Sequence, residues 1–161
     1  DGLRNALMCL NQARYGIAWG ALGSAMATFQ ASLDYATTRI QFKGRPIAAH
    51  QLQQRKLAWM YSEIVKGQLL ALQMGRLKDR GELRHEAVSL GKRNNVWVAR
   101  ECAKLAREIH GANGIVSEYP IMRHLMNLET VFTYEGTHDI HTLVLGNYLT
   151  GIPAFDPPAE S

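Results

Sequence analysis

The residues of this sequence best suited to chemistry are six in a row, Tyr134-Glu135-Gly136-Thr137-His138-Asp139, with apolar, helix-periodic sequence on both sides. Gly136 allows the backbone to turn, and Thr137 and Asp139 are residue types that cap a new helix. A carboxylate on such a turn, beside an aromatic ring and an apolar bundle, is partly desolvated and therefore a stronger base. Glu135 is thus a candidate general base at neutral pH. The same pattern is also typical of a simple helix-capping turn whose Glu faces water.

Metal binding is a second chemistry that the residue spacing could indicate. The pairs Glu82–His85 and Glu135–His138 both match Glu-x-x-His, the ligand spacing of di-iron helical bundles. Such a site also needs inward-facing acids on two further helices, which offer only Asp34 and Glu63. Both pairs also lie at expected helix starts rather than in mid-helix. We therefore expect no metal site.

Three other groups of residues suit ligand binding. The segment Arg39-Ile40-Gln41-Phe42 combines a fixed cation, an amide and an aromatic ring. Arg binds phosphate bidentately and Phe stacks on a flat ring such as adenine, although Arg near a helix C-terminus is also ordinary dipole complementation. The segment His110-Gly111-Ala112-Asn113-Gly114 brings backbone close to a ligand or simply stops a helix. Asn11 and Arg14, one helical turn apart, form a polar grip or a solvated face.

The helices that position these residues follow from the spacing of apolar residues. Spacings of three and four predict five helices: Leu3–Ile40, Pro46–Asp79, about Glu82 to Gly111, a fourth after Pro120, and a fifth from the Glu135 turn to Gly151. No segment alternates with period two, so we expect no strands. The fold class is all-α, an antiparallel up-and-down bundle with a four-helix core and a short C-terminal helix. We expect His138 and His141 to be polar groups on a helix face.

Composition narrows the class of protein. The chain has 161 residues, of which 47% are apolar and 20% charged, enough for one domain with a sizeable core. Its net charge is +4, but the basic residues are dispersed, which argues against a nucleic-acid face and fits a few anionic phosphates. No apolar run has the length of a membrane span. The chain opens at Asp1 without an initiator Met, so we expect it to be a piece of a larger polypeptide.

Two further patterns concern compartment and packing. Cys9 and Cys102 each lie in helical sequence, and we expect both to be buried thiols in a reducing compartment, either a bacterial cytoplasm or a mitochondrial matrix. The small residues between Gly16 and Ala25 predict the close approach of a neighbouring helix.

Taken together and in this order, these pieces resemble the C-terminal domain of the acyl-CoA dehydrogenase family, and most of all its glutaryl-CoA dehydrogenase branch. Three segments carry the resemblance: residues 13–20, residues 75–79, and residues 126–141, which include Thr-His-Asp-Ile-His. The similarity runs from about Gly2 to Phe155. We expect residues 1–155 to form the domain and residues 156–161 to be a frayed tail.

The resemblance implies an FAD enzyme that desaturates an acyl-CoA thioester between its α and β carbons. Glu135 falls on the family's catalytic base, which removes the α proton while flavin N5 accepts the β hydride. Tyr134 and Gly136 would line the thioester pocket, and Asn11 and Arg14 match positions that contact CoA. In the glutaryl branch, decarboxylation to crotonyl-CoA follows, a step that this segment does not determine.

The resemblance also assigns cofactor contacts and partners. The pyrophosphate and adenine of a neighbouring subunit's FAD would be held by Arg39, Gln41 and Phe42. The next flavin-contacting stretch would include Glu108, Gly111 and Gly114. The subunit's own FAD would be faced by Thr137 and Asp139. A homodimer or homotetramer is therefore implied, with electron-transfer flavoprotein as the electron acceptor. The acyl-CoA substrate would be glutaryl-CoA.

The sequence departs from the family pattern in two ways. Lys43 precedes Gly44, and the interval from Arg39 to Pro46 is one residue longer than usual. The family's N-terminal helical domain and middle β-domain are absent from this chain, so we expect the chain alone to be inactive. The alternative from a different class is a non-catalytic helical assembly module of the same fold.

Overall fold

The computed structural model describes residues 2–154, so the tail prediction for residues 156–161 lies outside the described part. The elements in chain order are α1 (Gly2–Thr38), β1 (Ile40–Gln41), β2 (Arg45–Pro46), the 3-10 turn η1 (Ile47–Ala49), α2 (Gln51–Asp79), α3 (His85–His110), the 3-10 turn η2 (Gly111–Gly114), α4 (Ile121–Thr133) and α5 (His138–Thr150). The predicted all-α class and the five helices are confirmed. No described helix combines the length and apolar character needed to cross a membrane.

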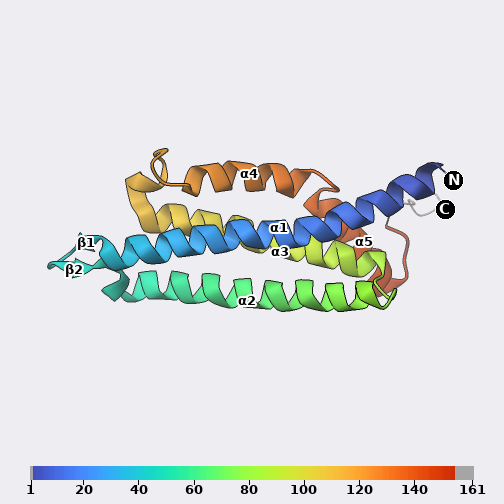
Figure 1. Cartoon of the computed structure of the whole chain (residues 1–161), viewed down its shortest axis with the longest axis horizontal. Helices are drawn as coiled ribbons and strands as arrows, with labels where there is room; N and C mark the ends of the chain where they lie inside the picture. Colours follow the sequence, from blue (N-terminus) through green and yellow to red (C-terminus); the bar gives the residue numbers. More distant parts are fainter. Residues whose placement is uncertain (1, 155–161) are drawn as a thin grey trace, which may run out of the picture.

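Helices α1 to α4 lie side by side and alternate in direction along the chain, as Figure 1 shows. Helix α3 is the central element, because it contacts α1, α2, α4 and α5. The short helix α5 packs on α3 near the end of the bundle where α1 begins (Figure 1). The arrangement is therefore the predicted antiparallel bundle with a short C-terminal helix.

The core forms where the apolar period predicts it on α2. The residues of α2 that recur at spacings of three and four form a seam that is buried along its whole length: Leu57, Met60, Ile64, Gly67, Ala71 and Met74. Gly67 is needed there, because a Cβ atom would lie 2.6 Å from Leu22 Cδ2. The buried Asn95 of α3 donates Nδ2–H bonds to the carbonyls of Ala18 at 3.0 Å and Gly67 at 3.2 Å. One amide thus joins α1, α2 and α3.

The connection from α1 to α2 differs from the prediction. Pro46 does not begin a helix. It ends an antiparallel hairpin of two strands with two residues each, in which Ile40 pairs with Pro46. The hairpin turns through left-handed φ values at Phe42, Lys43 and Gly44, of 47°, 61° and 69°. Strands of two residues are too short to show an alternating pattern, which is why no strand was expected.

The predictions for Cys9, for the start of α3 and for His141 also differ from the structure. Cys102 is buried, and desolvation raises the pKa of its thiol to about 12, but Cys9 is exposed. Helix α3 begins at His85 rather than Glu82. His141, expected as a polar group on a helix face, is the buried residue of α5, while the apolar Ile140 and Leu143 are exposed.

Candidate active site

The turn between α4 and α5 carries Glu135 in an unusual backbone conformation. Glu135 has a φ of 57° and Gly136 a φ of 87°, both left-handed. Gly136 adopts this freely, whereas a non-glycine residue does so uncommonly, in turns and at functional sites. Thr137 caps α5 as predicted, because its Oγ1 accepts from the Ile140 N–H at 3.2 Å. Asp139 lies instead in the exposed first turn of α5, where its charge suits the helix dipole.

A buried lysine from α3 binds the backbone on both sides of Glu135. Lys92 Nζ donates to the carbonyl oxygens of Val131 at 2.9 Å, Tyr134 at 2.9 Å and Gly136 at 2.8 Å. Its side chain is only 1% exposed. Burial lowers the pKa of the Lys92 ammonium to about 8, with a smaller lowering from Arg14 and an opposing effect of Glu135. At neutral pH the group is therefore mostly a cation with three acceptors.

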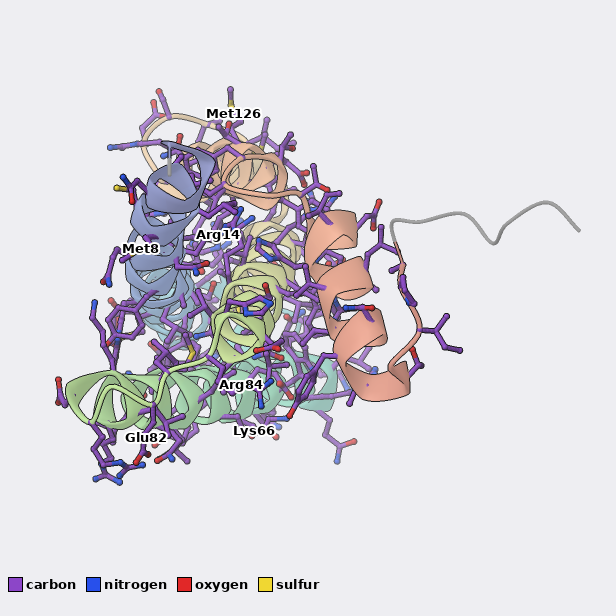
Figure 2. All side chains as sticks on the ribbon, turned by 90° about the vertical axis from the view of Figure 1, so that its right-hand side faces the viewer. Met8, Arg14, Lys66, Glu82, Arg84 and Met126 are labelled. Atoms are coloured by element: carbon purple, nitrogen blue, oxygen red, sulfur yellow. The ribbon has the colours of Figure 1, made fainter. Side chains whose placement is uncertain are left out.

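The carbonyl oxygen of Glu135 has two side-chain donors of its own. Arg14 Nε donates to it at 2.8 Å, and His141 Nε2 lies 3.2 Å away. Figure 2, which looks along the bundle, shows Arg14 on the inner side of α1. His141 Nδ1 lies 3.1 Å from Ser89 Oγ. Residues of α1, α3 and α5 thus converge on one turn.

The protonation of His141 follows from its surroundings. Burial, together with the nearby charges of Lys92 and Arg14, lowers the pKa of His141 to about 4, and the Glu135 carbonyl opposes this effect. At pH 7 the imidazole is therefore neutral, with one donor and one acceptor nitrogen. Because Nε2 faces a carbonyl, Nε2–H donates to Glu135, and Nδ1 accepts from the Ser89 hydroxyl.

The carboxylate of Glu135 is half-buried and free to act on another molecule. Its Oε2 atom is buried and has no hydrogen-bond partner among the described residues. The neighbouring Tyr134 is 48% exposed, so the turn opens toward solvent on that side. A carboxylate oxygen with no protein donor, on a backbone fixed by three helices, can accept a proton from a bound molecule.

Lys92, Ser89 and His141 were not singled out as site residues from the sequence. Their position becomes clear only in the fold, because Lys92 lies 43 residues before Glu135 in the chain. One local sign was present. Lys92 is four residues from both Val88 and Val96, so it lies on the buried face of α3.

The predicted phosphate and adenine residues gather at the opposite end of the bundle from the Glu135 turn. They line an open cavity of about 1300 Å³ between the hairpin, the start of α2 and the end of α3. Of the predicted residues, the cavity lining includes Arg39, Gln41, Phe42, Glu108 and Gly111. Gly114 is not in the lining; it is buried, and a Cβ atom there would lie 2.7 Å from the Arg107 carbonyl. Its role is therefore close packing of η2 on α3.

The cavity suits a ligand with a flat ring and an anionic group. Phe42 is 74% exposed and its ring meets His50 edge-on at 5.6 Å. Three buried polar atoms of the lining have no partner within residues 2–154: His50 Nε2, Gln53 Oε1 and His110 Nε2. The Arg39 guanidinium supplies donors, and the exposed Phe42 ring supplies a stacking surface. Gln53 Oε1 is an acceptor, and so is Nε2 of the neutral His110, because its Nδ1–H donates to the Ala106 carbonyl at 2.8 Å.

The remaining predicted residues are placed as follows. Asn11 lines a smaller cavity of about 250 Å³ with Tyr15, Lys78 and His85. The Glu-x-x-His pair at residues 82–85 is split, because Glu82 pairs with Arg80 at 2.9 Å and His85 Nδ1 faces Glu86 at 3.5 Å. The described residues contain no group of three or more His, Cys, Asp or Glu side chains that could hold a metal ion.

Comparison with known proteins agrees with this arrangement. The sequence family of the acyl-CoA dehydrogenase C-terminal domain matches residues 1–149. An acyl-CoA dehydrogenase of Bacillus subtilis (strain 168) is 37% identical over 151 residues, which cover 94% of this chain and 40% of the relative. A crystal structure of glutaryl-CoA dehydrogenase from Mycobacterium smegmatis is 57% identical, with a TM-score of 0.91 over 93% of this chain and 38% of that one.

Another M. smegmatis glutaryl-CoA dehydrogenase, in complex with FADH2, is 46% identical, with a TM-score of 0.89 over 92% of this chain and 38% of that one. The chain therefore spans about two fifths of the length of these relatives. The resemblance seen in the sequence is confirmed, and the cofactor that it indicates is FAD. The chain belongs to the acyl-CoA dehydrogenase family and matches that family's C-terminal helical domain.

Proposed function

We propose that this chain is the C-terminal catalytic-base domain of an FAD-dependent acyl-CoA dehydrogenase, and that Glu135 is the base. The observation that carries the proposal is the free, buried Oε2 of Glu135 on a turn whose carbonyls are held by Lys92, Arg14 and His141. Glu135 takes the proton from the α carbon of the thioester. FAD, when bound, supplies the acceptor for the hydride that leaves the β carbon.

The residues around Glu135 have supporting roles. Tyr134 and Gly136 line the thioester pocket, since the Tyr134 ring is exposed beside the turn. Arg14 Nε is engaged by the Glu135 carbonyl, so its contact with CoA uses the terminal guanidinium nitrogens. Asn11, one turn earlier on α1, contributes a second polar group to CoA. Thr137 and Asp139 face the flavin from the start of α5.

The cavity at the hairpin end holds the adenine and pyrophosphate of a second FAD, which belongs to a neighbouring subunit. This proposal is supported by the distance between the cavity and the Glu135 turn. From Arg14, which contacts the turn, to Thr38, which precedes the hairpin, α1 extends on the order of 36 Å at ~1.5 Å per residue. Figure 1 places the hairpin and α5 at opposite ends of the bundle. One chain therefore serves two cofactors, and the complete protein is a homodimer or homotetramer. Its electron acceptor is an electron-transfer flavoprotein.

Glutaryl-CoA is the substrate that we propose for the complete protein. The support is the 57% identity to a glutaryl-CoA dehydrogenase of M. smegmatis. Turnover of glutaryl-CoA against butyryl-CoA, with detection of CO₂, tests both the substrate and the decarboxylation step. Preference for butyryl-CoA without CO₂ would place the protein in another branch of the family.

The test of the base is Glu135→Gln in the complete natural protein that contains this chain. The change is nearly isosteric and removes the proton-accepting oxygen, so turnover should fall roughly 10²–10⁴-fold. FAD content and melting temperature should stay close to wild type. Glu129→Gln is the matched control, because Glu129 is an exposed acid of α4 that pairs with Arg100 at 2.5 Å. Near-wild-type turnover in Glu135→Gln would refute the assignment.

A further inference from the structure

Lys92 is unusual for a charged residue. Among the described Lys, Arg, Asp and Glu residues, Lys92 alone is buried, and it is 1% exposed. A buried ammonium is unfavourable unless its N–H groups are satisfied. No carboxylate of the described part forms an ion pair with it; its three donors go instead to three backbone carbonyls. The chain thus keeps a buried cation at a position where an apolar residue would suit the core.

The three acceptors all belong to one short stretch. Val131 lies in the last turn of α4, Tyr134 is its C-cap, and Gly136 follows the proposed base. With Arg14 and His141 on the Glu135 carbonyl, every carbonyl from residue 134 to 136 has a side-chain donor. None of these three oxygens accepts a backbone N–H bond within the described loops. The shape of the turn therefore depends on side chains from other helices.

The conformation that Lys92 supports is one that Glu135 would not keep unaided. A left-handed φ at a non-glycine residue persists only when its surroundings enforce it. The carbonyls of Tyr134 and Gly136 flank this residue, and one ammonium holds both, so rotation of the Glu135 backbone would break at least one bond. The carboxylate direction is set by the same backbone angles.

We propose that Lys92 is a positioning residue: it clamps the carbonyls on both sides of Glu135, fixes the left-handed turn, and so directs the carboxylate toward its substrate. The clamping of the turn stands on the contacts alone. Its kinetic consequence rests on the proposed function of Glu135 as base.

The test is Lys92→Met in the complete natural protein, with Lys66→Met as the matched control. Met keeps an unbranched apolar chain but removes the donors, whereas Lys66 is an exposed lysine of α2 that pairs with Glu63. Hydrogen–deuterium exchange is measured on peptides that cover residues 131–137 and, for comparison, the core of α2. We expect faster exchange in the turn and unchanged exchange in α2 for Lys92→Met, and no change in either for Lys66→Met.

Steady-state kinetics on the same proteins give the second readout. A misdirected base should lower kcat roughly tenfold to a hundredfold while KM and FAD content change little, because the substrate and cofactor contacts remain. If the wild type has no acyl-CoA dehydrogenase activity, the proposed function fails, but the exchange experiment still decides whether Lys92 holds the turn. Faster turn exchange with unchanged kcat would overturn the positioning role.

Lys92→Gln is a second variant, which keeps the test possible if Lys92→Met does not fold. Lys92→Gln keeps two N–H donors on a shorter side chain, so its turn exchange and kcat should fall between those of wild type and Lys92→Met. Unchanged exchange at residues 131–137 in either folded variant would overturn the proposal. Failure of both variants to fold would do the same, because Lys92 would then be a residue of general stability.

Discussion

Arg14 Nε lies 2.8 Å from the backbone oxygen of Glu135, a contact between residues that are 121 positions apart in the chain. It joins the early part of α1 to the turn that carries the proposed base. The same guanidinium lies on the face of α1 that we assign to CoA. The proposed function therefore couples substrate binding and the position of the base through one side chain.

Arg14→Lys should weaken this coupling. Lysine keeps the positive charge but not the planar fork that bonds the carbonyl and leaves other nitrogens for CoA. We expect kcat to fall roughly tenfold, with FAD content unchanged because Arg14 contacts the Glu135 backbone and is not one of the residues that we assign to FAD. Turnover kinetics with an acyl-CoA, beside flavin absorbance, provide the measurement. Arg76→Lys, an exposed site on α2, is the control, and equal kinetics in the two variants would contradict the role of Arg14.

His141 should make stability depend on pH on the acid side. Its folded pKa is about 4, whereas an unfolded histidine titrates near ~6.5. Between these values the unfolded chain binds a proton that the folded chain does not, so stability falls as the pH falls. The contribution lost between pH 6.5 and 5 is about 2 kcal/mol.

The measurement compares the melting temperatures of wild type and His141→Gln at about pH 7 and about pH 5. Gln has an Nε2–H that can replace the donor to the Glu135 carbonyl, but it does not titrate. The wild type should therefore lose more stability than the variant as the pH falls. His110, His124 and His138 also have pKa values lowered by burial, but their effect is common to both proteins. Parallel pH profiles would count against His141.

Local periodicity was enough to predict the helices and the buried seam of α2, because each depends on residues three and four apart. It was not enough for α5. Ile140, Leu143 and Tyr148 have the spacing of a buried face, yet they are exposed in this chain and His141 is buried instead. Apolar residues at spacings of three and four show that one face of a helix is apolar. They do not show whether that face packs inside the same chain.

The candidate site was predictable in part for a similar reason. Glu135, Gly136 and Thr137 are consecutive in the chain, so their types and order indicate the turn and its cap. The groups that hold the turn come from α1, α3 and α5, and nothing in the local sequence connects Lys92 to Glu135. Only the burial and the contacts of the folded chain identify Lys92 as part of the site.

Arg39→Gln should weaken FAD binding in the complete protein. A charge-assisted hydrogen bond to phosphate contributes roughly 1.5–3 kcal/mol, which corresponds to a Kd for FAD raised by about tenfold to a hundredfold. Titration of the apoprotein with FAD, followed by flavin fluorescence, measures the change. Arg55→Gln removes an exposed cation of α2 that does not line the cavity, and its Kd should equal that of wild type. An unchanged Kd in Arg39→Gln would mean that the cavity does not hold the pyrophosphate.

Two glycines on neighbouring helices separate internal packing from assembly. A Cβ atom on Gly67 would lie 2.6 Å from Leu22 Cδ2, whereas a Cβ on Gly20 would have no described neighbour within 4 Å beyond its own helix. Between Gly16 and Ala25, the small residues that pack inside the bundle are Ala18, Ala21 and Ala25. The glycine face of α1, formed by Gly16, Gly20 and Gly23, is exposed. The exposed Trp19 and Met26 extend that face. We expect it to meet a second copy of the chain in the proposed oligomer.

The same substitution at both glycines gives the test. Gly67→Leu overpacks the core and should destabilise the protein by about 1–3 kcal/mol or more, seen as a lower melting temperature. Gly20→Leu should leave the bundle intact, since it adds helix propensity of roughly 0.8 kcal/mol and meets no internal atom. Its effect should appear in light scattering at micromolar concentration, as a smaller assembly than that of wild type. If Gly20→Leu retains the wild-type assembly and melting temperature, the glycine face of α1 is not where the subunits meet.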